Sequence, residues 1–448
     1  MKPPHLIALF LALHASPLLA AQDSPHPEPR MSYVENEFIR LGVDLNLGGA
    51  ITWLSAKGGE NIVNSMDLGR QIQMSHYAGP APYSAAGQTP APHWAHLGWN
   101  PIQAGDDFGH GSRTLEHTND QHTRLYTKCV PLQWPLNNVP AECTFECWLT
   151  LDGPTVRLHS RLNNARSDHA LYPARLQELP AIYLNAPFHR LLSYTGEQPF
   201  TDAPLTTVTR PPGTLHPWAH WYATEHWAAL LNDQDWGLGL YHPACLHFTG
   251  GFDGQPGPND PRAAATGYLA AQTLEALDHN ITYDSHCQLI LGTLAEIRAY
   301  VKKQTPAPGP LIWKFDQDRQ GWRSQNATDP GLPFQNHWTL QLEKEDPQLI
   351  SPHFFLNATP ASTITIRAAF HTAHTHATLF WQRLQDGQPV PGGTLDFPIQ
   401  GDSFLRDYSI RLQDTPAFRG PIVELRLDPA PTGTPGDFIR LHSITFTP

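Results

Sequence analysis

Three side chains that can do chemistry lie close together in the sequence: the cation Arg70, the proton carrier His76 and the phenol Tyr77. In an extended strand, successive side chains alternate between the two faces. One face would then carry Arg70, Ile72, Met74 and His76, and the other Gln71, Gln73, Ser75 and Tyr77. A strand that only fills a core has one apolar face, so this pattern predicts a groove that holds a polar ligand. The catalytic candidates here are Arg70, His76 and Tyr77, with Gln73 as a ligand contact; a solvent-exposed sheet face is the alternative.

A polar and aromatic loop over residues 93–110 is a second candidate. It carries three His, two Trp and the adjacent carboxylates Asp106 and Asp107. Loops often supply binding and catalytic residues, although adjacent Asp residues also serve in turns. We expect Asp107 to be a catalytic carboxyl, and the substrate contacts to be Trp94, Trp99 and His110.

Two later segments carry further acids. Glu178 lies beside an apolar run, where burial would raise its pKa as a general acid requires; the alternative is a sheet-end carboxylate paired with Arg175. Residues 216–227 are dense in rings and titratable groups. There we expect Glu225 to be catalytic and the substrate contacts to be Trp218, His220, Trp221 and His226. Aromatic filling between two sheets is the alternative.

These residue types fit three classes of glycan chemistry. A lyase that acts on a uronate polymer needs a cation, a base and an acid, for which Arg70, His76 and Tyr77 are suited. A glycoside hydrolase needs two carboxyl groups, for which Asp106, Asp107, Glu178 and Glu225 are candidates. A protein that only binds glycans could use the same groove.

Composition narrows the fold and the partners. The 448 residues include 44 Pro and 33 Gly, which interrupt long helices and favour an all-β protein with many loops. The net charge of −12 argues against nucleic acid as a partner. Residues 1–21, with Lys2, an apolar run and small residues at the end, predict a signal peptide and a secreted or periplasmic protein. No later stretch is apolar enough to span a bilayer, so no membrane partner is expected after cleavage.

The five Cys allow at most two disulfides in an exported protein. Cys129 and Cys143 flank a hairpin-like connection, so we expect them to pair. Cys245 and Cys287 could pair or be buried hydrophobic residues. No Cys-x-x-Cys occurs and the His are scattered, so neither a metal nor another cofactor is predicted.

The chain divides into two blocks. Residues 31–301 contain short strand-like runs and one helix candidate at Thr293–Val301. Residues 302–310 are rich in Pro and read as an extended linker, and 311–448 form a second block of alternating strands. Because this linker offers few contacts, we expect the two blocks to fold independently.

The second block opens with Trp313-x-Phe315 and Gly321-Trp322, and ends near Leu425-Arg-Leu-Asp-Pro429 and a last apolar strand. This pattern resembles the β-sandwich carbohydrate-binding modules, which implies a jelly-roll sandwich. Sugar rings present apolar faces that stack on aromatic side chains. The stacking candidates are Trp322, Trp338 and Trp381, with core Trp as the alternative.

The first block carries Phe38-Ile-Arg-Leu-Gly-Val-Asp-Leu-Asn-Leu-Gly-Gly-Ala-Ile-Thr-Trp-Leu54, followed by Gly69-Arg70 and later Thr266-Gly-Tyr-Leu-Ala270. This pattern resembles the galactose mutarotase-like proteins. The resemblance implies a supersandwich of two large antiparallel sheets, and an Arg at the sugar pocket. The His and Glu of the mutarotases have no clear counterpart here, which puts plain anomer interconversion in doubt.

These observations together predict an exported, carbohydrate-active enzyme that cleaves an oligosaccharide or polysaccharide. Hydrolysis is slightly favoured, because the aromatic loops carry many acids and the net charge disfavours a polyanionic substrate. A polysaccharide lyase and a non-catalytic glycan-binding protein are the alternatives.

Overall fold

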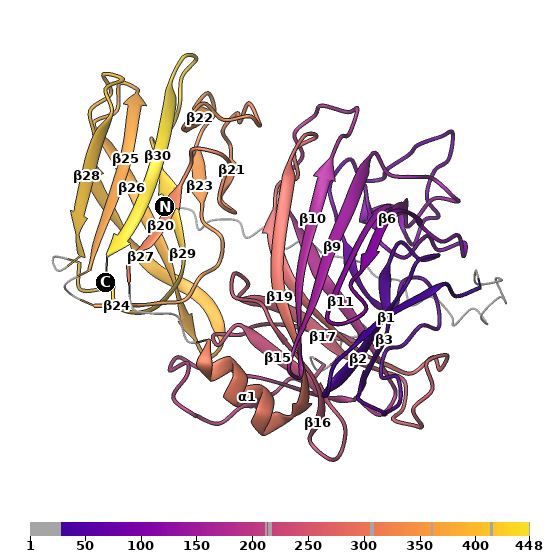
Figure 1. The fold of residues 1–448 in the computed structure, drawn as a ribbon. Coiled ribbons are helices and arrows are strands. Elements are labelled where there is room, and N and C mark those ends of the chain that lie inside the picture. Colours follow the sequence, from indigo (N-terminus) through magenta and orange to yellow (C-terminus); the bar gives the residue numbers. More distant parts are fainter. Residues whose placement is uncertain are drawn as a thin grey trace.

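The computed structural model describes residues 28–210, 213, 217–304, 309–359, 362–412 and 415–447. The predicted signal peptide and residues 305–308 of the predicted linker therefore lie outside the described residues. Strands dominate the described residues and form four antiparallel sheets, of which the second pair lies beside the first (Figure 1). The prediction of an all-β protein is confirmed.

The first pair of sheets is built from β1 to β19. Within the described part of the chain, the larger sheet has ten strands: β1 (Met31–Glu35), β2 (Ile39–Asp44), β3 (Ala50–Ala56), β4 (Ile72–Ser75), β5 (Pro101–Ile102), β8 (Leu132–Gln133), β11 (Arg175–Asn185), β14 (Trp218–Tyr222), β17 (His247–Asp253) and β18 (Thr266–Glu275). The other sheet has nine: β6 (Arg113–Asn119), β7 (Arg124–Val130), β9 (Cys143–Asp152), β10 (Thr155–Asn164), β12 (Arg190–Ser193), β13 (Thr206–Thr207), β15 (Trp227–Leu231), β16 (Trp236–Tyr241) and β19 (Thr282–Thr293).

One apolar core joins these two sheets. Ile182 and Leu269 enter it from the ten-stranded sheet, and Phe145 and Leu289 from the nine-stranded sheet. Side chains alternate along each strand, so the ten-stranded sheet has a core face and an outer face. The predicted supersandwich is confirmed.

The predicted helix is also present, as α1 (Leu294–Lys303). Thr293 accepts a hydrogen bond from the backbone N–H of Glu296, whose side chain accepts one from the N–H of Thr293, a reciprocal cap that stabilises the first turn. A short 3-10 helix, η1 (Ala95–Leu97), lies in the loop before β5. No helix among the described residues has the length and apolar character needed to cross a membrane.

The second pair of sheets is built from β20 to β30. In the described residues, one sheet has five strands: β20 (Leu311–Lys314), β22 (Trp338–Gln341), β25 (Thr363–His371), β28 (Arg406–Arg411) and β30 (Phe438–Thr447). The other has six: β21 (Arg323–Gln325), β23 (Gln348–Ile350), β24 (Leu356–Ala358), β26 (His376–Gln385), β27 (Gln388–Pro398) and β29 (Gly420–Asp428). A separate apolar core lies between them, and the predicted second sandwich is confirmed.

The three Trp residues predicted to stack on sugar belong to this second core. Trp322 and Trp338 are 0% exposed and Trp381 is 3% exposed. Trp322 packs edge-on against Phe315, and Trp381 against Phe418. Their faces are covered by protein, so the prediction that they bind glycan is wrong.

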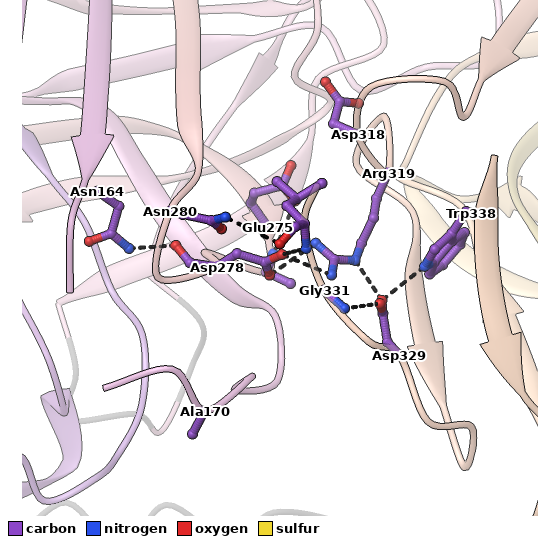
Figure 2. A network of polar contacts seen from close by, with 12 residues as sticks. Asn164, Ala170, Glu275, Asp278, Asn280, Asp318, Arg319, Asp329, Gly331 and Trp338 are labelled. Carbon is purple, nitrogen blue, oxygen red and sulfur yellow. Dashed lines mark hydrogen bonds and ion pairs between the residues drawn. The ribbon is translucent and has the colours of Figure 1, made fainter. Parts of the chain in front are cut away.

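A buried ionic bridge joins the two sandwiches (Figure 2). Arg319 of the second sandwich donates to Asp278, which lies between β18 and β19, at 3.0 Å, and to Asp329 at 2.6 Å. All three side chains are 2% exposed. Asp278 also accepts from the N–H of Leu332, and Asp329 from Trp338 Nε1. These contacts brace the two blocks against each other, and the expectation that each block folds independently stays a prediction.

The predicted disulfide is absent. All five Cys are free and buried. Cys129 lies opposite Phe145 in the β7–β9 pair, two residues away from Cys143, so the two thiols do not face each other across the ladder. Among the described residues, no group of three or more His, Cys, Asp and Glu side chains is arranged to hold a metal ion.

Candidate functional site

An aromatic row crosses the outer face of the ten-stranded sheet. Tyr183 on β11 lies opposite Tyr268 on β18, and the ring centroids are 4.7 Å apart. Tyr268 lies opposite Gly251, which in turn lies opposite Trp218. Because Gly251 has no side chain, Trp218 reaches Tyr268 at a centroid distance of 4.8 Å. Tyr183 and Trp218 are partly exposed, so this row presents aromatic surface to solvent.

Glu178 is the carboxyl group next to this row. Tyr268 donates its hydroxyl to Glu178 at 2.7 Å, and Tyr77 donates its hydroxyl to the other carboxyl oxygen at 3.2 Å. Burial raises the pKa of Glu178, and the two phenol donors oppose that shift. A carboxyl with a raised pKa that remains partly exposed can transfer a proton to a bound ligand.

A bulge in β11 places Glu178 on the outer face. The register with β18 shifts between Glu178 and Ala181: Glu178 lies opposite Gln272, while Ala181 lies opposite Ala270. The three-residue advance from Glu178 to Ala181 on β11 is therefore opposite a two-residue advance on β18, which defines a β-bulge. Simple alternation from Ala181 would have placed Leu179 on the outer face, but Leu179 is in the core.

Gln177 and Arg175 position Tyr77. The Gln177 amide accepts from the Tyr77 N–H at 2.7 Å and donates to the Tyr77 carbonyl at 2.8 Å. Arg175 donates to the carbonyls of Leu97 at 2.6 Å and His96 at 3.1 Å, so it holds the loop that follows Tyr77. The alternative, a pair between Glu178 and Arg175, is not what the structure shows, because the Arg175 guanidinium binds these carbonyls and Glu178 accepts from phenols.

Arg70 and Asp67 lie at the other end of the aromatic row. Arg70 Nε is 3.0 Å from Asp67 Oδ2, and Arg70 Nη1 donates to the Ala264 carbonyl at 2.7 Å. The pKa of Tyr183 is raised by burial and by the charges of Glu178 and Asp67, and Arg70 opposes that shift. Tyr183 is thus within electrostatic reach of both carboxylates and of the guanidinium.

His76 does not share this face, which corrects the prediction that it lies beside Arg70. It is 2% exposed, and its ring lies 4.9 Å from Phe145 in the core. Burial lowers the pKa of His76 to about 3. The cause is the alternation itself, since Ile72 and Met74 define the core face of β4 and His76 follows them.

Gln73 and Trp99 are also structural. Gln73 is 1% exposed; it donates to the Leu68 carbonyl and accepts from the Ala104 N–H, so it joins two loops. Trp99 is 0% exposed within the first core. Both predicted substrate contacts are therefore contradicted by burial.

The loop 93–110 forms its own cluster. Trp94 Nε1 donates to Asp107 at 2.6 Å, and the Trp94 ring packs edge-on against Trp134. His110 Nδ1 lies 3.0 Å from Asp106, which also accepts from three backbone N–H groups as a turn residue does. Burial raises the pKa of Asp107, and the neighbouring charges include Asp67. The charge of Asp67 therefore reaches this loop, and Arg175 of β11 binds its backbone at His96 and Leu97.

Most of the 216–227 segment is structural, which corrects several predictions. Glu225 is 2% exposed and accepts from the Phe200 N–H at 2.8 Å and from Trp227 Nε1 at 2.9 Å, so its oxygens hold a turn. Trp221 is 5% exposed in the first core. His226 has a φ of 61° and its Nδ1 lies 2.9 Å from the Cys245 carbonyl, which identifies it as a turn residue.

Of the predicted contacts in that segment, Trp218 and His220 lie on the outer face. Trp218 joins the aromatic row, and the exposed ring of His220 stacks on His247 with the centroids 5.4 Å apart. Of the predicted residues, the structure thus brings Arg70, Tyr77, Glu178, Trp218 and His220 to one face. It adds Asp67, Tyr183 and Tyr268, which sequence reasoning missed. Asp67 had a readable signal, an acid three residues before Arg70.

Comparison with known proteins bears on the fold. No model of a protein family matches the chain, and no curated protein matches it. Solved structures do match. A galactose mutarotase-like protein from Lactobacillus casei has 12% identity over 58% of this chain and 100% of its own, with a TM-score of 0.37. One from Clostridium acetobutylicum has 8% identity over 60% of this chain and 96% of its own, with a TM-score of 0.38.

The 4-alpha-glucanotransferase from Thermococcus litoralis has 9% identity over 60% of this chain and 40% of its own, with a TM-score of 0.31. The resemblance stated from the sequence and the first two of these structures name the same group of proteins. Neither the activity nor the substrate of this chain follows from matches with TM-scores of 0.31 to 0.38.

Proposed function

We propose that this is an exported enzyme that hydrolyses a glycosidic bond on the outer face of the first sandwich, with Glu178 as the general acid. The observation that carries the proposal is the Glu178 cluster: a partly exposed carboxyl, with its pKa raised by burial, accepts hydrogen bonds from Tyr77 and Tyr268. A general acid must hold its proton until the leaving oxygen takes it, and a raised pKa serves that step.

The second carboxylate in this proposal is Asp67. Glycoside hydrolysis commonly needs two carboxyl groups that flank the bond. The charges of Glu178 and Asp67 both act on Tyr183, so a sugar resting on that ring would be near both carboxyl groups. Asp67 therefore replaces Asp107 and Glu225 as the partner of Glu178. Its role would be to activate water or to stabilise the positive charge that develops on the sugar ring.

Sugar binding would use the rings and the guanidinium on the same face. Tyr183 and Trp218 offer partly exposed aromatic surface to the apolar face of a sugar ring. Arg70 is partly exposed and adjoins Asp67, so its remaining donors can reach sugar hydroxyls.

A lyase is the second candidate, because Arg70 and the hydroxyl of Tyr77 belong to the same face as Glu178. Arg70 would neutralise a uronate carboxylate and Tyr77, with Glu178, would move the protons. His76 has no part in this version, since it faces the core.

Digestion of a panel of neutral and uronate oligosaccharides tests the proposal. New reducing ends without unsaturated products support hydrolysis, whereas absorbance from an unsaturated sugar supports the lyase. Glu178→Gln and Asp67→Asn should each abolish most turnover, while Glu116→Gln, an exposed carboxylate on β6, should leave it unchanged. Sugar binding without any turnover would contradict both enzymes and identify a glycan-binding protein. Full turnover by Glu178→Gln would place the site elsewhere.

A further inference from the structure

Strand β14 leads from the aromatic row to the second sandwich. Trp218, His220 and Tyr222 are alternate residues and share the outer face. Trp218 contacts Tyr268 at one end, and at the other end Tyr222 packs edge-on against His353 of the second sandwich, with the centroids 5.0 Å apart. Trp218 and Tyr222 are about 13 Å apart along an extended strand. That length exceeds a single sugar ring.

Imidazole rings lie along the outer face of β14 between Trp218 and Tyr222. His220 stacks on His247, and His247 lies 5.3 Å from the Tyr222 ring and 6.4 Å from the His353 ring. Burial lowers the pKa of His247 to about 3 and that of His353 to about 4, so both rings are neutral near pH 7. A neutral imidazole offers one donor and one acceptor, which suits a sugar hydroxyl.

Contacts within and between the sandwiches hold the second sandwich beside the Tyr222 end of β14. Glu424 accepts from Arg323 at 3.0 Å and from Gln382 at 2.8 Å, and it lies 3.4 Å from His353 Nε2. Beneath these polar groups, Leu246 of the first sandwich packs with two buried apolar residues of the second, Leu384 and Val423. His353 and Arg323 are therefore held rigidly beside β14 and remain partly exposed.

Within the described residues, a buried amide on the same face has an oxygen without a hydrogen-bond partner. Gln272 lies opposite Glu178 in the register and is 8% exposed. Its Oε1 atom has no hydrogen-bond partner within the described part of the chain. Leaving a buried acceptor unpaired is costly, so such an atom marks a place where a ligand hydroxyl would be favoured.

We propose that His220, His247 and Tyr222, with His353 and Arg323 of the second sandwich, form a further sugar subsite. This inference rests on the proposed function and specifies its substrate. The substrate is a chain of at least two sugar units, with one ring on the aromatic row beside Glu178 and Gln272 and the next along β14. The second sandwich then acts as a wall of the binding site, which is a different role from that of a separate glycan-binding module.

Binding of linear oligosaccharides of increasing length tests the subsite. The probes are gluco-, galacto-, manno- and uronate oligosaccharides of one to four units, titrated calorimetrically into the full chain. We expect affinity to rise from one unit to three. His220→Ala and His353→Ala should weaken binding of the longer chains by about fivefold, as the loss of one hydrogen bond or ring contact would, and leave the single sugar unchanged.

His371→Ala is the matched control, because that exposed imidazole stacks on Phe438 of the second sandwich. It should change none of these affinities. His220 is exposed, so its variant keeps the test valid if His353→Ala fails to fold. Equal affinity for all lengths, or variants that weaken all lengths alike, would overturn the subsite alone. If no sugar binds to the wild-type chain, both this inference and the proposed function fall.

Discussion

Two carboxylate clusters in this protein differ in one component, a cation, and in their exposure to solvent. Asp278 and Asp329 contact the guanidinium of Arg319, and all three side chains are almost fully buried. Glu178 instead accepts from the phenols of Tyr77 and Tyr268 and remains partly exposed. A buried charge with a full counter-charge is a structural bridge, whereas a carboxyl among neutral donors keeps a raised pKa and can exchange a proton.

Removal of the cation from the bridge should have the largest effect on stability. Arg319→Ala leaves two buried carboxylates without their counter-charge, so we expect a loss of about 3–5 kcal/mol in the free energy of unfolding. Chemical denaturation of the full chain measures this loss. An Arg367→Ala variant, which breaks an exposed ion pair with Asp407, should cost at most about 1 kcal/mol. Equal losses in the two variants would contradict the structural role of the bridge.

The same kind of change at Glu178 should affect activity and leave the fold intact. In Glu178→Gln the amide oxygen can still accept from a phenol, so we expect a melting temperature close to that of the wild type. Turnover should fall by about a hundredfold or more, the usual contribution of a general acid. Thermal melts and initial rates on the same preparations measure the two effects. A large loss of stability with normal specific activity would make Glu178 another structural carboxylate.

Tyr268→Phe should have the smallest effect, on the pH profile. The Tyr268 hydroxyl lowers the pKa of Glu178 by donating to it, in opposition to burial. Activity that needs protonated Glu178 falls as pH rises through that pKa. Without the hydroxyl the pKa of Glu178 rises further, so the alkaline limb of the rate profile should move to higher pH. Tyr77 also donates to Glu178 and lowers its pKa, so Tyr77 should be kept unchanged in this experiment.

A limb that stays in place or moves to lower pH in Tyr268→Phe would show that Glu178 is not the group titrating in the rate profile. Tyr300→Phe is a suitable control, because Tyr300 lies on α1 and packs against a separate apolar cluster that contains Ile297 and Val301. Its profile should match that of the wild type.

The fold was readable from the sequence because its signals are local. Short alternating runs predicted the strands, and the helical spacing of Leu294, Ile297 and Val301 predicted the helix. The site depended on contacts between distant residues. Glu178 was selected from its apolar neighbours, but Tyr268 is 90 residues away in the sequence and meets it through the β11 bulge. The periodicity of the sequence gives no signal for that bulge.

The errors have equally physical causes. His76 was placed beside Arg70, although its alternation with Ile72 and Met74 put it on the apolar face. Trp322, Trp338 and Trp381 were taken for ligand platforms, but a sandwich of this size needs large rings in its core. The ion pair between Asp278 and Arg319 was also missed, because the sequence of the linker carries no information about contacts between the two blocks.

The central claim is that sugar binds on the outer face of the first sandwich, between Glu178 and Asp67. A crystal structure of Glu178→Gln with a bound oligosaccharide that the wild type degrades tests this claim most directly. We predict a sugar ring against Tyr183 and Trp218, with the glycosidic oxygen within hydrogen-bond distance of residue 178 and the chain continuing along β14. A sugar bound elsewhere, with this face empty, would contradict the account.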